Sequence, residues 1–297
     1  MSRIRSIQRP EEGLSIKKHG MKSTLGFNSL KCLLSLGMLA AMPSQFLARA
    51  ADGPSAPPMS ERSAANNVTV TNSALVPVTW LERDSYNWEE RHAQVLETQK
   101  TLDPEIVLIG DSITHFWAGP PISRQQNGPK AWAETFGNHR VMNMGFGWDR
   151  TQNVLWRLDH GEMDGTHPKT IVLNIGSNNF TQTRNARENT PAEVAEAIAA
   201  ILDRIHQKSP ESRIIVMGVL PRGFEAVGHY RTRITALNEL LAKQLAGKPW
   251  ISFLDISAQL VTADGTISRD IMFDATHPTE AGYAIWGKAL LAAGVLQ

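Results

Sequence analysis

The sequence predicts an α/β fold, a three-layer α/β/α sandwich built on a five-stranded parallel sheet. Five short runs are almost wholly apolar and rich in β-branched residues, which is typical of strands buried on both faces. Helical patterns separate successive runs, and parallel pairing of consecutive strands requires such crossovers. The predicted strands cover residues 106–110, 140–144, 170–175, 213–219 and 250–254.

The segments beside these runs predict the helices. Trp88, Val95 and Leu96 fall on the apolar side of the first helix, and Thr190-Pro191 is a start signal for the longest. Right-handed crossovers cover both faces of the sheet, so a single domain of about 220 residues is expected. The predicted helices cover residues 87–101, 149–159, 192–207, 229–245 and 278–293.

Residues 1–50 are typical of a secretory signal peptide. Basic residues precede an apolar run at 32–42, and residues 48–50 (Ala-Arg-Ala) have the small-x-small form of a cleavage site. The basic part is long, and a start at Met21 would give a leader of more ordinary length. A membrane anchor is the weaker alternative, because residues 43–45 interrupt the run short of the roughly 20 residues that a spanning helix needs. We therefore expect a periplasmic or extracellular protein, cleaved near position 50.

The rest of the chain is expected to be a flexible linker followed by one folded domain. Residues 51–76 are small, polar and initially proline-rich, and the domain is expected over 77–297. The leader holds eight Lys and Arg and two Asp and Glu, which leaves 22 basic and 27 acidic residues after cleavage. That balance argues against a nucleic acid or an anionic membrane as partner. The single cysteine, Cys32, is lost with the leader, so neither a disulfide nor a metal thiolate is expected.

Polar residues follow the predicted strands, where the sheet of an α/β fold binds its ligands. Ser112 follows the first strand, Gly145 the second and Asn178 the third, whereas Asp274 and His277 follow the fifth. Serine is a weak nucleophile until a histidine, oriented by a carboxylate, takes its proton. We therefore expect Ser112 as nucleophile, His277 as base and Asp274 as its orienting acid. The backbone N–H groups of Ser112 and Gly145 and the amide of Asn178 would stabilise the oxyanion.

Each of these residues also has a structural interpretation. Ser112 could be a helix N-cap, with Asp111 satisfying a backbone N–H group. Gly145 and Asn178 could be turn formers, and Asp274 and His277 could cap the last helix. His115 is an alternative base, since positions i and i+3 share a helical face. No carboxylate is supplied to fix its tautomer, so we expect His115 to be a wall residue and Asp111 to support the turn. The other histidines of the mature chain are expected at the surface or in loops.

Four motifs carry a resemblance to a known family: GDSIT (110–114), GFG (145–147), GSNN (176–179) and DATHP (274–278). In order and spacing they resemble the four sequence blocks of the SGNH, or GDSL, hydrolase superfamily. The segments NMGFGWDRTQNVLWRLDHGEMDG, VLPRG and DGTISRDIMFDATHPTEAGY resemble the catalytic subunits of intracellular platelet-activating-factor acetylhydrolase and their bacterial relatives. The resemblance spans about 77–297. It implies the same flavodoxin-like sandwich and the same five site residues, and a homodimer is the assembly that this branch suggests.

Three further side chains are expected near the substrate. Trp117 and Trp148 follow Ser112 and Gly145 closely, and indole faces suit both sugar rings and acyl chains. Each tryptophan could equally be a packing residue. Arg222, in the turn after the fourth strand, could contact a polar group of the substrate or pair with a surface acid.

The sequence thus predicts a secreted serine esterase that removes short acyl groups, above all acetyl, from a carbohydrate or similar alcohol. No phosphate-binding glycine motif follows the first strand and the histidines lack metal-ligand spacing, so neither a cofactor nor a metal is expected. One alternative is a lipase or phospholipid acetylhydrolase of the same fold. Another is a carbohydrate-binding or scaffold protein that retains the fold without activity.

Overall fold

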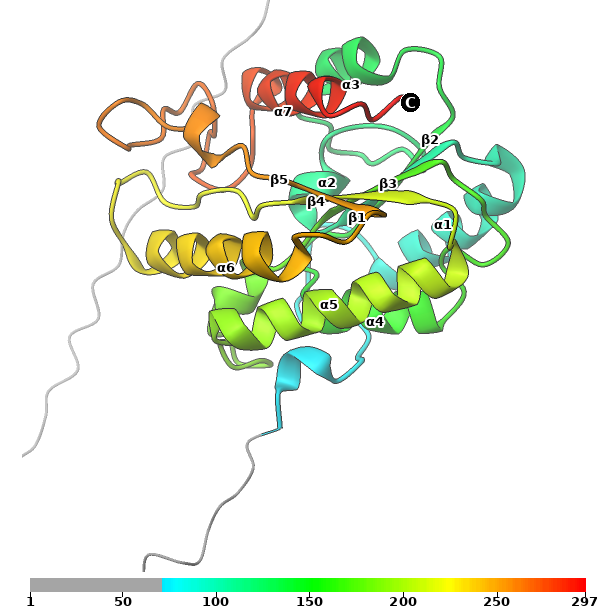
Figure 1. Ribbon diagram of the computed structural model, residues 1–297, viewed down its shortest axis with the longest axis horizontal. Helices are drawn as coiled ribbons and strands as arrows, with labels where there is room; N and C mark the ends of the chain where they lie inside the picture. The colour runs from blue at the N-terminus through cyan, green and yellow to red at the C-terminus, as the bar shows by residue number, and fades with distance from the viewer. Residues whose placement is uncertain (1–70) are drawn as a thin grey trace, which may run out of the picture. The chain divides into compact units, whose positions relative to one another are not determined.

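The computed structural model describes residues 71–297 (Figure 1). The predicted signal peptide and residues 51–70 of the predicted linker lie outside the described residues. The strands are β1 (Ile106–Gly110), β2 (Val141–Gly145), β3 (Thr170–Asn174), β4 (Arg213–Met217) and β5 (Ile251–Leu254). The α-helices are α1 (Trp88–Leu102), α2 (Ser112–His115), α3 (Pro129–Phe136), α4 (Thr151–Asp159), α5 (Pro191–Lys208), α6 (His229–Leu245) and α7 (Glu280–Ala292).

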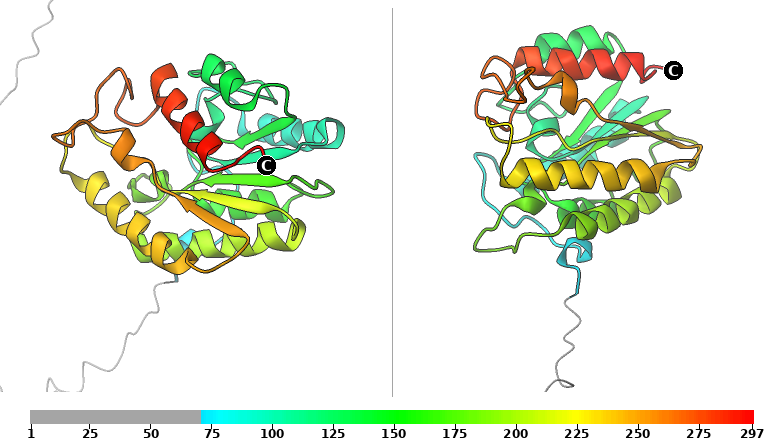
Figure 2. Two further views of the ribbon diagram at one scale, coloured as in Figure 1. Left: turned by 45° about the horizontal axis from the view of Figure 1, so that its top comes forward. Right: turned by 60° about the vertical axis from the view of Figure 1, so that its left-hand side comes forward.

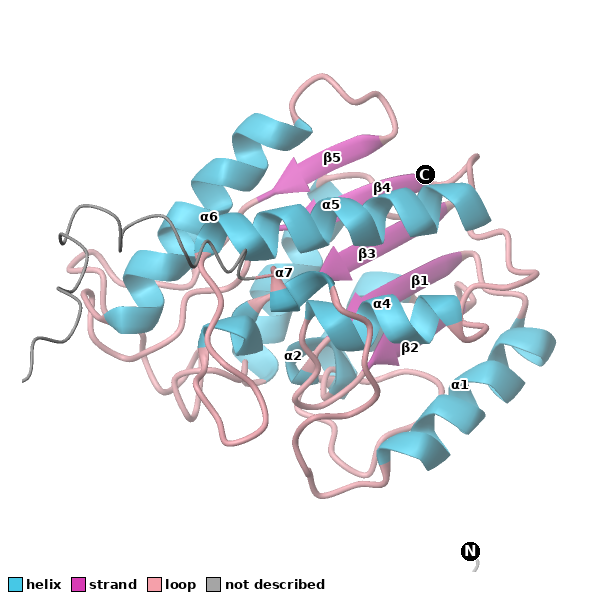
Figure 3. Cartoon of the chain, turned by 90° about the horizontal axis from the view of Figure 1, so that it is seen from below, coloured by secondary structure: helices cyan, strands magenta, loops and turns pink. Residues whose placement is uncertain are grey.

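The strands form one parallel sheet in the order β2-β1-β3-β4-β5. All strand arrows in Figure 3 point the same way. Gly110 at the end of β1 is level with Gly145 of β2 and Asn174 of β3. The connections leave β1 in one direction and β3 in the other, so the loops beyond these strands enclose the crevice where α/β proteins bind ligands. The predicted α/β/α sandwich is confirmed.

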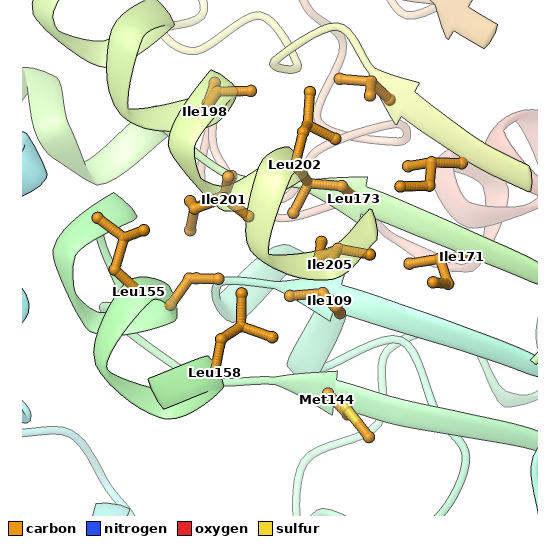
Figure 4. Close-up of a cluster of buried hydrophobic side chains, with 14 of the residues drawn as sticks. Ile109, Met144, Leu155, Leu158, Ile171, Leu173, Ile198, Ile201, Leu202 and Ile205 are labelled. Atoms are coloured by element: carbon orange, nitrogen blue, oxygen red, sulfur yellow. The ribbon is translucent and has the colours of Figure 1, made fainter. Parts of the chain in front are cut away.

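Two apolar layers cover the sheet. Because side chains alternate along a strand, Val107 and Ile109 of β1 join the layer with α1, α4, α5 and α6, whereas Ile106 and Leu108 join the layer with α3 and α7. Figure 2 shows α3 and α7 on one side of the sheet and α5 and α6 on the other. In the first layer, the isoleucines and Leu202 of α5 lie over the strands (Figure 4). This packing fixes the strands and thereby positions the loops that follow them.

The N-terminal boundary of the domain differs from the prediction. Ser73–Leu75 form a short 3-10 helix, η2, and Ala74 is fully buried. Asn72 caps this helix and donates a hydrogen bond to the carbonyl of Glu193 at 3.0 Å, and Thr151 donates one to the carbonyl of Ala74 at 3.0 Å. The last residues of the expected linker are therefore part of the folded domain. The Asn72 side chain bonds α5 and the Ala74 carbonyl bonds α4, which the composition of the segment alone does not reveal.

Two helices between β1 and β2 were not among the predicted elements. Helix α2 is only four residues long, and α3 follows a loop that ends at Gly128 and Pro129. Neither contains the repeated apolar spacing of a long helix. Within residues 71–297, no helix combines the length and the apolar character needed to cross a membrane.

Candidate active site

The turn that presents Ser112 is tightly constrained. β1 ends at Gly110, where an added Cβ would lie 2.2 Å from Thr114 Oγ1 and 2.5 Å from the carbonyl oxygen of Asn174, so only glycine fits. Asp111 is the N-cap of α2, and its Oδ1 accepts a hydrogen bond from Ile113 N at 2.9 Å. Burial raises the pKa of Asp111 to about 7. The expectation that Asp111 supports the turn is thus confirmed.

Ser112, His277 and Asp274 form a hydrogen-bonded chain. His277 Nε2 lies 2.8 Å from Ser112 Oγ, and His277 Nδ1 lies 2.6 Å from Asp274 Oδ2. The other carboxylate oxygen of Asp274 accepts hydrogen bonds from the backbone N–H groups of Thr276 and His277 at 3.0 and 2.7 Å. Partial burial works to raise the pKa of Asp274, but the hydrogen bonds from His277 outweigh it and leave that pKa below its ordinary value. The carboxylate is therefore ionised and holds the imidazole with Nε2 toward the serine.

Ser112 opens into a cavity of about 370 Å³, hereafter the catalytic cavity. Asn178, His277 and the predicted substrate residues Trp148 and Arg222 line it as well. It is walled further by residues that sequence reasoning did not single out, namely Asp84, Phe116, Gln125, Phe273 and Thr276. Most of these come from loops outside the four motifs, so no local pattern marked them.

Gly145 does not occupy the position expected of an oxyanion donor. It is the last residue of β2, and its N–H donates to Asn143 Oδ1 at 2.9 Å. An added Cβ would lie 2.3 Å from the backbone nitrogen of His115, so this glycine is required for the close approach of β2 to α2. Gly145 does not line the catalytic cavity. The structure therefore corrects this prediction and assigns Gly145 to packing.

Trp148 offers a backbone donor that sequence reasoning missed. Its φ of 64° is left-handed, an uncommon conformation for a side chain of this size. Among the described residues nothing accepts a hydrogen bond from its N–H, and the residue borders the catalytic cavity. The N–H of Ser112, at the first position of α2, is likewise without an acceptor in the described part of the chain. Asn178 uses one amide hydrogen on the carbonyl of Asp149 at 3.0 Å and keeps the second.

Trp117 was expected at the rim of the site, and this prediction is wrong. The residue is fully buried in the layer between the sheet and α7, where its ring stacks on Trp286 at 4.7 Å and on Tyr283 at 5.2 Å. Helix α2 ends at His115, so the chain has already turned into the core two residues later. Its role is packing.

Arg222 faces the catalytic cavity without a carboxylate partner among the described residues. Its guanidinium donates to Thr276 Oγ1 at 3.2 Å and to Thr181 Oγ1 at 2.9 Å, and it lies 4.1 Å from the ring centroid of Tyr230. These neutral partners fix the side chain, and none of them neutralises the positive charge of the guanidinium. Of the two alternatives that the sequence left open, an ion pair with a surface acid is not found among residues 71–297.

A buried ion cluster, Arg157 with Asp149 and Glu162, contacts both Gly110 and Asn178. Arg157 Nε donates to Asp149 Oδ2 at 2.8 Å, and its other nitrogens bond Glu162 and approach the carbonyl oxygen of Gly110 at 3.4 Å. The three charged side chains are at most 1% exposed. Since the carbonyl of Asp149 also accepts a hydrogen bond from Asn178, this cluster connects the turn before Ser112 with Asn178.

His115 is unsuited to act as the base. Its Nδ1 accepts a hydrogen bond from Gly147 N at 3.2 Å, and burial together with the charges of Arg91 and Arg157 lowers its pKa to about 2. It does not line the catalytic cavity, as a wall residue would, and borders two other pockets instead. His92 departs from the expected surface location, because it is 9% exposed and packs near Trp88. Within 71–297 no group of three or more His, Cys, Asp or Glu residues is arranged to hold a metal ion.

Known proteins resemble this chain in sequence and in fold. The model of the GDSL-like lipase/acylhydrolase family matches residues 108–285. Platelet-activating factor acetylhydrolase IB subunit alpha1 from Bos taurus is 34% identical over 218 residues, which cover 73% of this chain and 86% of that protein. Subunit alpha2 from Rattus norvegicus is 36% identical over 197 residues, 66% of this chain and 79% of that protein.

A solved structure of an Axe2 mutant, an acetyl-xylooligosaccharide esterase from Geobacillus Stearmophilus, matches with a TM-score of 0.50 and 18% sequence identity. The match covers 63% of this chain and 92% of that protein. At this identity the likeness concerns the fold.

Proposed function

Because the chain belongs to the GDSL-like lipase/acylhydrolase family and is an ester-hydrolysing enzyme, we propose that it removes acetyl groups from hydroxyls of a carbohydrate or similar alcohol. The observation that carries this proposal is the chain of hydrogen bonds from Asp274 through His277 to Ser112 at the wall of a cavity lined by both polar and aromatic side chains. The acetyl preference is supported by the acetylhydrolase relatives.

The reaction follows from this geometry. Ser112 Oγ attacks the ester carbonyl carbon while His277 Nε2 takes the hydroxyl proton, and the Asp274 carboxylate stabilises the resulting imidazolium. The carbonyl oxygen becomes an oxyanion, for which the donors are the N–H groups of Ser112 and Trp148 and the amide of Asn178. His277 then protonates the departing alkoxide, which leaves an acyl group on Ser112. Water attacks that acyl-enzyme with His277 as base, releasing acetate and restoring the serine.

The walls of the catalytic cavity favour a polyhydroxylated alcohol. Asp84 supplies a hydrogen-bond acceptor and Arg222 supplies donors. Gln125 can donate and accept, and Trp148 adds an aromatic face. Planar polar side chains beside an aromatic ring suit the alternating hydroxyls and apolar faces of a sugar. A volume of about 370 Å³ is near the lower end for small-molecule sites, so it suits a short acyl group.

Hydrolysis of a phospholipid acetyl ester is the second candidate. The sequence identity to platelet-activating factor acetylhydrolase subunits favours it. Phe116 and Phe273 add apolar surface to the same cavity, and Phe273 is 43% exposed. Both candidates use the same chemistry on Ser112 and differ in the alcohol.

Export is part of the proposal. The basic segment, the apolar run at 32–42 and the Ala-Arg-Ala at 48–50 support a cleaved leader, and the carbohydrate esters of a cell wall or of plant material lie outside the cell. Expression of the full chain and N-terminal sequencing of the secreted product tests this. A mature N-terminus near position 51 supports export, and full-length protein retained in the cytoplasm contradicts it.

The substrate proposal is tested with a panel of esters. We expect turnover of 4-nitrophenyl acetate and acetylated xylooligosaccharides, with kcat/KM falling as the acyl chain lengthens. The Ser112→Ala variant should lose this activity, and Ser257→Ala, which changes a serine outside the cavity, should keep it. A preference for long acyl chains or for acetylated phospholipid over acetylated sugar would overturn the carbohydrate assignment. Glycan binding without any ester turnover would overturn the enzymatic one.

A further inference from the structure

A second cavity adjoins the catalytic cavity. Its volume is about 360 Å³, and it shares Phe116 and Gln125 with the catalytic cavity. We call it the side cavity, and its principal lining residues are Tyr86, His115, Phe116, Ser123, Arg124 and Gln125. Since two residues border both spaces, the side cavity is a direct neighbour of the catalytic cavity.

The two cavities differ in charge. The carboxylates of Asp84 and Asp274 line the catalytic cavity, whereas the side cavity is lined by no acidic residue and by one cationic residue, Arg124. Arg124 is exposed. In the part of the chain that the structure describes, no carboxylate forms an ion pair with it. Glu90 borders a neighbouring pocket with Arg124 but does not reach it. The guanidinium is therefore available to an oxyanion from solution, which it can bind with two parallel hydrogen bonds.

His115 adds a fixed neutral donor to the same space. Its Nδ1 accepts the hydrogen bond from Gly147 N, so the proton of the neutral ring is on Nε2. The ring is held between the rings of Tyr86 and Phe116. Its centroid lies 4.7 Å from that of Tyr86, edge to face, and 5.0 Å from that of Phe116. Its Nε2 makes no hydrogen bond to another residue of 71–297, and the ring borders the side cavity. The side chains of Ser123 and Gln125 can donate as well.

We propose that the side cavity binds an anionic group, a carboxylate or a phosphate, on the alcohol portion of the ester. The proposal rests on the esterase function above and deepens it. The side cavity offers a cationic guanidinium, a neutral imidazole N–H and further hydrogen-bond donors, and no carboxylate lines it. These groups complement an oxyanion and interact less favourably with a neutral or cationic group. The preferred substrate is then an acetylated sugar acid or an acetylated phosphate ester.

The experiment compares matched substrate pairs. One pair is acetylated methyl glucoside and the acetylated methyl glycoside of glucuronic acid with its carboxylate free, and the other is acetylated glycerol and acetylated glycerol 3-phosphate. The quantity measured is the ratio of kcat/KM for the anionic member to that for the neutral member. Wild-type protein, Arg124→Gln and a control, Arg83→Gln, are assayed, because Arg83 is also an exposed arginine but lines neither the catalytic nor the side cavity.

For wild-type protein we expect the ratio of kcat/KM, anionic over neutral, to be about ten or more in at least one pair. A gain of this size is what one charge-assisted hydrogen bond contributes. The ratio should fall toward one in Arg124→Gln and at high salt, and stay unchanged in Arg83→Gln. A gain in the sugar pair alone identifies a carboxylate as the natural group, and a gain in the glycerol pair identifies a phosphate. A ratio near one in both wild-type pairs, or a ratio unchanged by Arg124→Gln, overturns the subsite. Failure of the esterase function is distinguishable, since 4-nitrophenyl acetate would then not be hydrolysed at all.

Discussion

The Nε2 atom of His277 lies 2.8 Å from Ser112 Oγ, although the two residues are 165 positions apart in the chain. The sheet makes this meeting possible, because Ser112 begins the helix after β1, and His277 follows β5 in the loop that leads to α7. The chemistry of the protein therefore depends on the alignment of strand-end loops.

Asp274→Asn is expected to reduce kcat/KM by about 10²- to 10⁴-fold, since an asparagine cannot hold the required tautomer or stabilise the imidazolium. The unfolding midpoint should change little, because the carboxylate is 41% exposed. Steady-state kinetics and thermal denaturation check both statements. Asp270→Asn, in the same loop but outside the cavity, is the matched control and should keep normal kinetics.

Asn178→Ala is expected to lower kcat by about 10²- to 10³-fold with a smaller change in KM, because the amide acts on charge that develops only in the transition state. The variant also loses the bond to the Asp149 carbonyl, so its stability must be measured alongside. A rise in KM with kcat unchanged would show that Asn178 binds substrate instead of the oxyanion.

The two tryptophans should behave differently. Trp117→Ala leaves a large cavity in the core and is expected to lower the free energy of unfolding by about 3–5 kcal/mol. Trp148→Gly keeps the backbone N–H and suits the positive φ, so turnover of 4-nitrophenyl acetate should persist while KM for acetylated oligosaccharides rises. Denaturant titration measures the free energy of unfolding of each variant, and steady-state kinetics measures its kcat and KM. Equal loss of stability in both variants would contradict the assignment of Trp148 to the cavity wall.

Asp111→Asn should change how stability depends on pH. Burial raises the pKa of Asp111 from 3.8 to about 7, so as the pH rises from about 4 to 7 the unfolded chain releases a proton that the folded chain retains. Wild-type protein thus loses stability over this interval, and the asparagine variant lacks that loss while keeping a cap acceptor for Ile113. The stability of the variant relative to wild type should rise by about 1–4 kcal/mol between pH 4 and pH 8. A difference that is flat with pH would contradict an elevated pKa.

The sheet was predictable because β1 and its neighbours are short apolar runs, and β1 and α6 have the bounds that the sequence indicated. The three-residue spacing of Asp274 and His277 likewise pointed to their hydrogen bond. The role of Gly145 was not predictable, since its N–H is occupied by Asn143, two residues earlier on the same strand. The burial of Trp117 depends on the length of α2, and the left-handed conformation of Trp148 depends on tertiary contacts. Such features follow from packing, which a local pattern does not record.

The central claim is that Ser112 is the nucleophile activated by His277. Reaction of the full chain with a fluorophosphonate, followed by peptide mass spectrometry, tests it most directly. We predict stoichiometric labelling at Ser112, loss of hydrolysis in step with labelling, and far slower labelling of a His277→Gln variant that remains folded. Label at another residue, or undiminished turnover after Ser112→Ala, would contradict the account.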